Sequence, residues 1–575
     1  MTNIPNAYKK VPMMFQAQTA GRCQLQRLDP DRRETHDRDR QPQDAEIWCE
    51  EWISETSSSP PQFSESVKTR EYIISWRFVT NSGQDDGVIR PVIGALGYPF
   101  YPGSSMKGAF RQACRKMNEF SDRVGRYCGQ ELSGGDFTPG ILRFHGGYPT
   151  DDSWADGLVD LVHPQQPRQV MDSSQTSAFI QISLYQSEIQ FGISTSEDLE
   201  ESEWNEIWRI WEVALSYGIG CRVSAGYGHQ DQLKGDLLYQ PHVLKGQGMA
   251  SKRLDGSGEF RANIFRAAIR GHALRIFGGL TDARTAEREV EKLFGGVSGH
   301  GTWGLLMMNF VTTNLEEELF GSGRWEVPSY KVEGQLGWLL AQKISNEQRT
   351  ALKDLILHLN QFAMIFGGFG KSWRRANHRL FYEEYYEENN NRKPLIGCHW
   401  QWTKRYARDV KVYTLKHITS FLTKLQDVAK VWLQLQGVEI GATYANGWRE
   451  AWHPDKVKVW GRIARNKEDS EAIQWLHQPY QTRDNQAQIP ELSIYKSSIT
   501  GKMGQIGRLW HRMYPLMRLD PDPNDSTKKI PKPTASYIEL LTIFPTDSKE
   551  CSDFLNFLAN DSQFSQLWGT PWRTK

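Results

Sequence analysis

The segment from Tyr101 to Met117, YPGSSMKGAFRQACRKM, constrains the fold most, because a turn, a helix start and an apolar face coincide there. Pro102 and Gly103 break the preceding extended segment, and Ser104 or Ser105 can cap a helix that follows. The residues that fall at helical spacing on one apolar face are Met106, Ala109, Phe110, Ala113 and Met117. We therefore expect an amphipathic helix that begins at this turn.

Three cations lie on another face of the expected helix. Lys107, Arg111 and Arg115 follow one another at intervals of four residues, so they form a stripe that runs away from the helix N-terminus. Unpaired backbone N–H groups and the helix dipole favour a phosphate at the Gly-Ser-Ser start, and the stripe can take neighbouring phosphates of the same strand. This geometry suits a polyanion, while the alternative is an amphipathic helix with a solvated basic face.

The segment before this helix, NSGQDDGVIRPVIGALGYPF (residues 81–100), carries two adjacent acids in a glycine-rich loop. Asp85 and Asp86 are followed by Arg90 and then by a turn into the Pro-Gly-Ser-Ser sequence. This order resembles the RAMP superfamily of CRISPR-associated RNA-binding proteins, in which an acidic loop precedes a Pro-Gly-Ser-Ser-x-Lys-Gly-x-x-Arg helix start. Here the pattern is met without a gap from Pro102 to Arg111.

A second motif lies downstream. Residues 217–229, YGIGCRVSAGYGH, include Arg222 and resemble the glycine-rich segment that closes a RAMP domain. Between the motifs, the pattern predicts strands near 72–78 and 141–145, two strands within 178–194, a helix at 204–215 and strand segments on both sides of Gly226. This order of strand, helix, two strands, helix and strand is the ferredoxin-like order that RNA-recognition motifs use.

The overall composition limits the classes of protein. With 575 residues, two or three domains are expected, and a net charge of +1 argues against a generic polycation, so any nucleic-acid surface must be local. Seven scattered cysteines without a C-x-x-C pair predict neither a zinc knuckle nor a disulfide framework, but a reduced, cytoplasmic protein. No apolar run approaches the length of a membrane span, and no signal peptide is visible. The charged insertion near residues 27–66 is expected to be disordered.

A second unit is expected after a weakly patterned boundary. Residues 258–279 contain Arg261, Arg266 and Arg270, and an acidic helix at 287–296 and an apolar strand at 303–311 follow. This progression resembles a second RAMP unit, although it lacks Pro-Gly-Ser-Ser. The fold class is therefore predicted as α+β, with tandem ferredoxin-like RAMP domains at 1–240 and 250–575, the second being larger and carrying insertions.

The segment GGFGKSWRRANHR (residues 367–379) mixes basic and aromatic side chains. It is not a phosphate-binding P-loop, because the required first glycine falls at Ile365 and the segment follows a helix. Lys371, Trp373, Arg374 and Arg375 suit a single RNA strand, and the alternative is a helix C-terminus with solvated charges.

Catalysis, if present, is expected from Asp85 or Asp86, which could hold a divalent cation or orient a 2′-hydroxyl; the alternative is a pair of soluble turn residues. Asp255 is a possible equivalent in the second unit. The resemblance implies an endoribonuclease subunit of a type III effector, which uses magnesium. Its partners would be a guide CRISPR RNA, a complementary target RNA, other RAMP subunits and a large signalling subunit. A non-catalytic scaffold and a guide-processing ribonuclease remain as alternatives.

Overall fold

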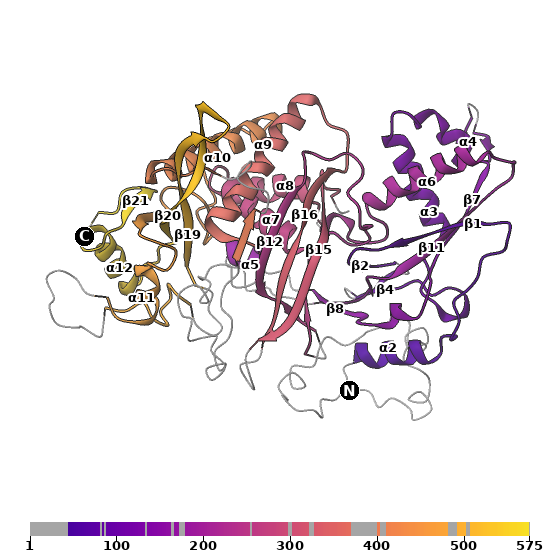
Figure 1. The fold of residues 1–575 in the computed structure, drawn as a ribbon, viewed down its shortest axis with the longest axis horizontal. Helices are drawn as coiled ribbons and strands as arrows, with labels where there is room; N and C mark the ends of the chain where they lie inside the picture. The colour runs from indigo at the N-terminus through magenta and orange to yellow at the C-terminus, as the bar shows by residue number, and fades with distance from the viewer. Residues whose placement is uncertain are drawn as a thin grey trace.

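The computed structural model describes the chain in thirteen stretches, and all structural statements below concern these residues. They are 44–80, 83–85, 88–132, 135–162, 166–171, 179–253, 256–296, 302–320, 327–369, 399–402, 410–480, 492–501 and 507–573. The larger sheets are antiparallel and carry helices, so the predicted α+β class is confirmed. Three units follow one another along the longest axis of the molecule (Figure 1).

Unit I comprises the described residues from 44 to 230. Its elements, in which η denotes a short 3-10 helix, are α2 (Asp44–Ser54), β1 (Lys68–Ile73), β2 (Arg77–Phe78), β3 (Gly83–Asp85), β4 (Val88–Arg90), η3 (Ala95–Gly97), α3 (Gly103–Lys116), η4 (Ser121–Arg123), α4 (Val124–Cys128), β5 (Gln130–Glu131), β6 (Phe137–Thr138), β7 (Leu142–Pro149), η5 (Ser153–Ala155), β8 (Val159–Val162), α5 (Gln166–Met171), β9 (Phe179–Ile182), β10 (Leu184–Tyr185), β11 (Glu188–Thr195), α6 (Glu201–Ser216) and η6 (Val223–Ala225).

The main sheet of unit I has the strand order β1-β11-β7, and α3 and α6 pack against each other beside it. The tryptophans of α6 are buried, as their helical spacing predicts. The strands expected around Gly226 are not present: this segment forms η6, and only an isolated bridge from Ile74 to Gln230 follows. Positive φ angles at Gly218, Gly220 and Gly226 explain the difference, because they turn the chain repeatedly.

The disorder expected across residues 27–66 is wrong for its second half. Residues 44–54 form α2, in which Trp48 and Trp52 are buried. The Trp52 Nε1 donates to the Gly97 carbonyl oxygen at 2.8 Å, and its ring lies 4.8 Å from that of Trp154. Two tryptophans four residues apart dock this helix on unit I, so burial of aromatic surface outweighs the charged composition of the segment.

Unit II comprises the described residues from 242 to 402. Its elements are β12 (His242–Met249), β13 (Ser251–Lys252), β14 (Gly258–Glu259), α7 (Ile264–Gly278), α8 (Ala283–Phe294), β15 (Leu306–Phe320), β16 (Val327–Leu340), α9 (Asn346–Phe362), the π-helix η8 (Ala363–Gly367) and β17 (His399–Trp402). The sheet has the order β15-β16-β12-β17, so the first strand lies between the third and the last along the chain.

Unit III comprises residues 458–568 and follows α10 (Leu415–Leu435). Its elements are β18 (Lys458–Ala464), α11 (Glu471–His477), β19 (Leu509–Asp522), β20 (Asp525–Ile543), α12 (Lys549–Asn560) and β21 (Ser565–Trp568). They form a separate sheet of order β19-β20-β18-β21, which repeats the arrangement of unit II. The single second unit expected at 250–575 thus contains two sheets.

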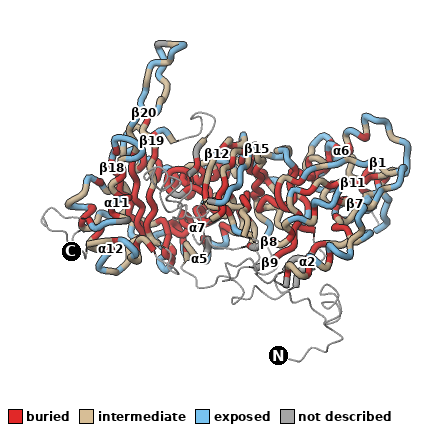
Figure 2. The backbone as a smooth tube through the Cα atoms, turned by 60° about the horizontal axis from the view of Figure 1, so that its bottom comes forward, coloured by how far each residue is buried: buried red, intermediate tan, exposed pale blue. Residues whose placement is uncertain are grey.

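The hairpin of β19 and β20 explains why this third sheet escaped prediction. Residues 519–533 are rich in proline and charge, a composition typical of a loop. Instead, the ladder continues through Leu519 opposite Pro531 and Pro521 opposite Lys529, and the hairpin projects from the body with exposed residues at its end (Figure 2). A two-stranded ribbon tolerates proline because an outward N–H needs no partner strand.

Candidate nucleic-acid interface

The start of α3 is an open helix N-terminus. The helix begins at Gly103, with Pro102 at the N-cap and no side-chain cap, so the serine cap expected from the sequence is wrong. Ser104 and Ser105 are exposed in the first turn. A Cβ on Gly103 would lie 2.0 Å from the Phe144 carbonyl oxygen of β7, so only glycine permits this close approach.

The basic stripe of α3, defined as Lys107, Arg111 and Arg115, lies on the solvent side of this helix. All three are exposed, and none forms an ion pair with any residue that the structure describes. Their charges act on one buried group: burial raises the pKa of the Cys128 thiol to about 11, and each of the three cations opposes that rise. The three cations therefore share one face, as the four-residue spacing predicts.

The acidic loop precedes α3 as a β-hairpin. β3 pairs with β4 so that Asp85 stands opposite Val88 and Gly83 opposite Arg90. The side chains of Asp85 and Arg90, and Asp86 altogether, lie outside the described residues. β4 packs against β9, and the Val92 N–H donates to Thr80 Oγ1 at 2.8 Å, which fixes the chain as it leaves the hairpin.

The glycine-rich segment of unit I is a tightly packed loop. A Cβ on Gly228 would lie 1.9 Å from the Ile219 carbonyl oxygen. His229 is buried between the carbonyl oxygens of Ser216 and Val223, at 2.9 and 2.8 Å, and burial lowers its pKa. Arg222 has a left-handed backbone with φ of 59° and donates from Nη1 to Gln181 Oε1 at 3.3 Å. The loop therefore presents Arg222 from a rigid, strained backbone.

Arg222, Arg266 and Arg270, which the sequence assigns to RNA binding, come together at the junction of units I and II. Burial, together with the charges of Arg270 and Arg222, lowers the pKa of Arg266 to about 9. Arg266 donates from Nη2 to the carbonyl oxygen of Phe294, and no carboxylate among the described residues lies within ion-pair distance of it. The carboxylates of Glu291 and Glu287 act on Arg270 and offset part of the positive charge of the three arginines.

Arg261 does not join them, and its expected place on an RNA-binding surface is wrong. It is only 6% exposed, and its Nη1 donates to Asp160 Oδ1 at 2.7 Å. In the same buried network, Arg77 Nη2 donates to Glu259 Oε2 at 2.6 Å. The sequence suggested an ordinary polar position on a half-buried strand for Arg77, yet the residue is fully buried. An arginine inside an otherwise apolar strand was the available signal for a buried ion pair.

The remaining candidates lie outside the described residues. These are Asp255, Lys371, Trp373, Arg374 and Arg375. Within the described part of the chain, no group of three or more His, Cys, Asp or Glu could hold a metal ion. None of its helices is both long and apolar enough to cross a membrane.

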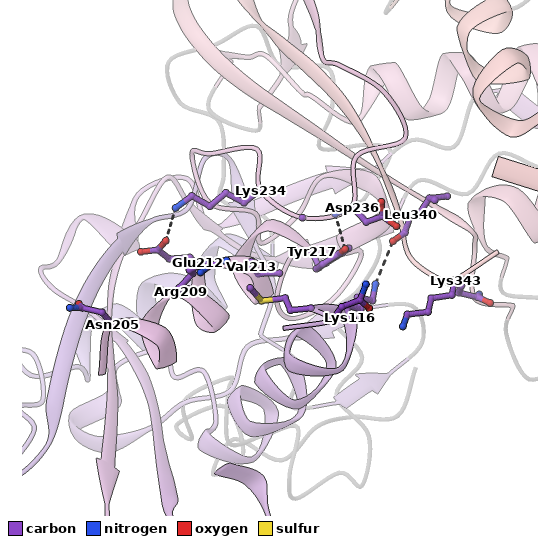
Figure 3. Close-up of a pocket in the computed structure, with 14 residues that line it drawn as sticks. Lys116, Asn205, Arg209, Glu212, Val213, Tyr217, Lys234, Asp236, Leu340 and Lys343 are labelled. Atoms are coloured by element: carbon purple, nitrogen blue, oxygen red, sulfur yellow. Dashed lines mark hydrogen bonds and ion pairs between the residues drawn. The ribbon is translucent and has the colours of Figure 1, made fainter. Parts of the chain in front are cut away.

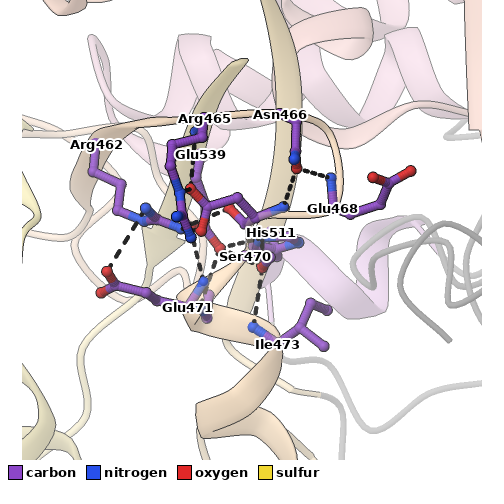
Figure 4. Close-up of polar contacts among 11 residues, drawn as sticks. Arg462, Arg465, Asn466, Glu468, Ser470, Glu471, Ile473, His511 and Glu539 are labelled. Carbon is purple, nitrogen blue, oxygen red and sulfur yellow. Dashed lines mark hydrogen bonds and ion pairs between the residues drawn. The ribbon is translucent and has the colours of Figure 1, made fainter. Parts of the chain in front are cut away.

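A second polar cluster lies in unit III (Figure 4). His511 Nε2 lies 3.0 Å from Glu539 Oε1, and Ser470 donates from Oγ to the same oxygen at 2.5 Å. His511 and Glu539 are fully buried, and Ser470 Oγ also accepts from the Ile473 N–H as the N-cap of α11. This Ser-His-Glu group is structural, because no substrate can reach it. His511 therefore belongs to the core of unit III.

Comparisons with known proteins give partial structural likenesses. No known family model matches the sequence, and no curated protein matches it. Among solved structures, a chain of a Type IV-B CRISPR complex aligns with 28% of this chain and 86% of its own length, at 16% identity and a TM-score of 0.20. Cmr6 from Pyrococcus furiosus aligns with 29% of this chain and 98% of its own length, at 14% identity and a TM-score of 0.18.

Proposed function

We propose that this chain is an RNA-binding backbone subunit of a CRISPR effector complex and that it holds a guide RNA along α3. The observation that carries the proposal is the basic stripe. Its three exposed cations have no carboxylate partner among the described residues and lie in line behind a helix start without a side-chain cap. The helix start offers backbone N–H groups to one phosphate, and the stripe offers cations to the next.

The architecture supports the same proposal. Unit III has the strand-helix-strand-strand-helix-strand order with the first strand inside the sheet. Unit II has the same order with a second helix, α8, after α7 and the short pair β13–β14 after the first strand, and the main elements of unit I follow the first five of these steps. We infer that the units are tandem ferredoxin-like domains, the topology of RNA-recognition motifs. The cluster of Arg222, Arg266 and Arg270 would place further positive charge where units I and II meet.

The partners follow from the motif resemblance. They are the guide RNA, a complementary target RNA, further RAMP subunits and a large signalling subunit. Base pairing with the guide would supply the sequence specificity, so the protein needs only contacts that hold the RNA backbone. A net charge of +1 fits this division of labour, because it disfavours indiscriminate binding of nucleic acid.

RNA binding is tested by fluorescence anisotropy with a labelled single-stranded RNA. The test variant replaces Lys107, Arg111 and Arg115 with glutamine, which keeps the helix propensity. The control replaces Lys353, Lys416 and Lys424, three exposed lysines of α9 and α10, in the same way. We expect at least about tenfold weaker binding for the stripe variant and none of this loss for the control. Equal losses in both variants would refute the stripe as the binding site.

Target cleavage by the acidic hairpin is a further part of the proposal. Carboxylates are the ligands that Mg²⁺ prefers, and Asp85 and Asp86 are adjacent in the sequence, shortly before α3 in the chain. The reconstituted complex is assayed for target-RNA cuts at nucleotide resolution, with and without magnesium, for wild type, Asp85→Ala and Asp86→Ala. Loss of particular magnesium-dependent cuts with unchanged guide binding would assign a nuclease centre to this chain.

Retention of every cut in both variants would favour the non-catalytic scaffold instead. Cleavage of the guide precursor by the isolated chain without metal would favour the guide-processing ribonuclease, which acts without the other subunits.

A further inference from the structure

A cavity of about 820 Å³ lies where unit I meets the end of β16 (Figure 3). Its walls come from the C-terminal end of α3, from α6, from the segment at 234–236 and from residues 340–343. A volume in this range is typical of small-molecule sites. The cavity is separate from the basic stripe: Lys116 follows Arg115 directly and is turned by about 100° around the helix axis.

Two of the lysines that line the cavity have no carboxylate within ion-pair distance among the described residues. Lys116 donates from Nζ to the carbonyl oxygens of Leu340 and Ala341, at 3.4 and 2.8 Å, and its Nζ lies 3.7 Å from the Tyr217 ring centroid. Lys343 is exposed, makes no ion pair with any described residue and lines the same cavity as Lys116 (Figure 3). The carbonyls and the ring hold the Lys116 ammonium group in place, without a carboxylate in ion-pair contact among the described residues.

The two acidic residues that line the cavity, Asp236 and Glu212, are each paired with a basic side chain. Asp236 accepts from Arg349 through both oxygens, with Nη2 at 2.7 Å and Nη1 at 3.1 Å. At the opposite end, Glu212 pairs with Lys234 at 2.5 Å. An excess of two positive charges therefore remains at the end formed by Lys116 and Lys343, and the low-dielectric walls strengthen its field.

The pKa of Lys116 would respond to a bound anion. Burial lowers the pKa of its ammonium group to about 8, and the carboxylate of Asp236 offsets only part of this effect. A dianion beside the ammonium group would stabilise the charged form and raise this pKa again.

We propose that this cavity binds a phosphomonoester, with the phosphate between Lys116 and Lys343. A phosphomonoester carries a charge of about −1.5 to −2 at pH 7, which matches the charges of Lys116 and Lys343, whereas a phosphodiester carries a single charge. Met117 and Val213 offer an apolar wall to the rest of the ligand, and Asn118 and Gln342 offer amides for hydrogen bonds. The ligand is thus a small phosphate ester with a partly polar body.

Isothermal titration calorimetry with AMP, inorganic phosphate and succinate tests the proposal. The full-length wild type is compared with Lys343→Gln, which removes an exposed side chain and leaves the fold intact. We expect AMP to bind, succinate to bind at least about tenfold more weakly, and Lys343→Gln to weaken AMP binding about 10- to 100-fold, as loss of a charge-assisted hydrogen bond predicts. Inorganic phosphate binding as well as AMP would show that the phosphate group alone is recognised.

The stripe variant, with Lys107, Arg111 and Arg115 replaced by glutamine, is the matched control and should bind AMP as wild type does. Loss of AMP binding in this control rather than in Lys343→Gln would overturn the assignment, as would the absence of AMP binding in wild type or equal affinity for succinate. A second readout is acetylation of Lys116 with acetic anhydride at pH 8, followed by peptide mass spectrometry. AMP should slow the reaction of Lys116 in wild type and leave it unchanged in Lys343→Gln; no protection in wild type would count against the site.

Discussion

Two sets of cationic side chains in this molecule lie in opposite environments. The stripe of α3 is exposed and has no carboxylate partner among the described residues, whereas Arg77 and Arg261 are buried between units I and II and pair with Glu259 and Asp160. Both sets occur in segments of the sequence that are rich in apolar residues. The difference is whether another part of the chain brings a carboxylate, since a guanidinium enters a protein interior only when it is paired.

The buried network is closed by further hydrogen bonds. Arg77 also donates from Nη1 to Ser183 Oγ at 2.7 Å and to the Gly157 carbonyl oxygen at 2.9 Å, while Trp76 Nε1 donates to Glu259 Oε1 at 3.1 Å. The carboxylate pKa of Glu259 stays below its usual value, because the hydrogen bond and charge of Arg77 outweigh the effect of burial. The buried network therefore holds units I and II together through paired charges. The stripe, in contrast, remains available to bind an external anion.

The largest expected effect comes from disrupting the buried ion pair of Arg77 and Glu259. Glu259→Gln removes the charge that pairs with Arg77 and leaves a buried guanidinium uncompensated, so we expect a loss of about 3–5 kcal/mol in the free energy of unfolding. Chemical denaturation followed by tryptophan fluorescence measures it. The control is Glu316→Gln, because Glu316 forms an exposed pair with Lys331 at 3.5 Å and should contribute at most about 1 kcal/mol. Similar losses in both variants would show that the buried pair contributes no more to stability than the exposed pair.

The second effect concerns affinity rather than stability. The stripe variant should show a shallower dependence of RNA binding on salt, by about 2 in the slope of log K against log salt, because three cations no longer displace counterions from a single strand. This corresponds to about 100-fold weaker binding at 0.1 M salt. Its free energy of unfolding should change by no more than about 0.5 kcal/mol. An unchanged slope would mean that the stripe is only a solvated face.

The third effect comes from the start of α3. Gly103→Ala forces a Cβ against the Phe144 carbonyl oxygen, so the helix start must move, and we expect a loss of about 1–3 kcal/mol in the free energy of unfolding. Gly108→Ala in the same helix is the control: nothing lies within 4 Å of the added Cβ, and alanine should stabilise the helix by about 0.5–1 kcal/mol. Equal and neutral effects would show that the close approach to β7 does not hold the helix start.

The smallest expected effect concerns Asp469, whose ion pair with Arg465 is intermediate between the buried pairs and the unpaired stripe. In unit III, Asp469 Oδ2 accepts from the Arg465 N–H at 2.8 Å and from Arg465 Nε at 3.1 Å, and these bonds lower the pKa of Asp469 to about 2. The folded pKa is below the unfolded value, so this stabilisation is present above pH 4 and is lost as the pH falls through 2. Asp469→Asn should cost about 1 kcal/mol at pH 7, because solvent screens the pair.

Urea unfolding at pH 7 and at pH 3 measures this effect, with Glu468→Gln as the neighbouring control. The difference between wild type and Asp469→Asn should narrow toward acid pH. A difference that stays constant would mean that Asp469 acts only as a neutral acceptor.

Much of unit I could be predicted from local patterns. The helix at 103–116, the helix around Trp204 to Leu215 and the two strands joined at Gln186–Ser187 follow from periodicity, and the structure has all of them. The phase of the basic stripe on α3 was equally predictable, because residues four apart share a helix face.

Other features could not be predicted, since their causes lie far away in the sequence. α2 depends on Trp52 meeting Trp154, and the proline-rich strands of unit III depend on each other across the β19–β20 hairpin. The burial of Arg261 depends on Asp160, about 100 residues earlier. In each case the local composition predicts a loop or an exposed position, because it contains no information about the distant residue that packs against the segment.

The sequence by itself therefore determined the helices with a strong apolar period, the two strands within 178–194 and the row of cations on α3. Only the tertiary structure decided which arginines stay in water, how many sheets follow unit I and that lysines from two separate segments, Lys116 and Lys343, line one cavity. The physical reason is that periodicity depends on neighbours within a turn or two. The burial or exposure of a charge depends on whether a distant carboxylate or backbone carbonyl reaches it when the chain folds.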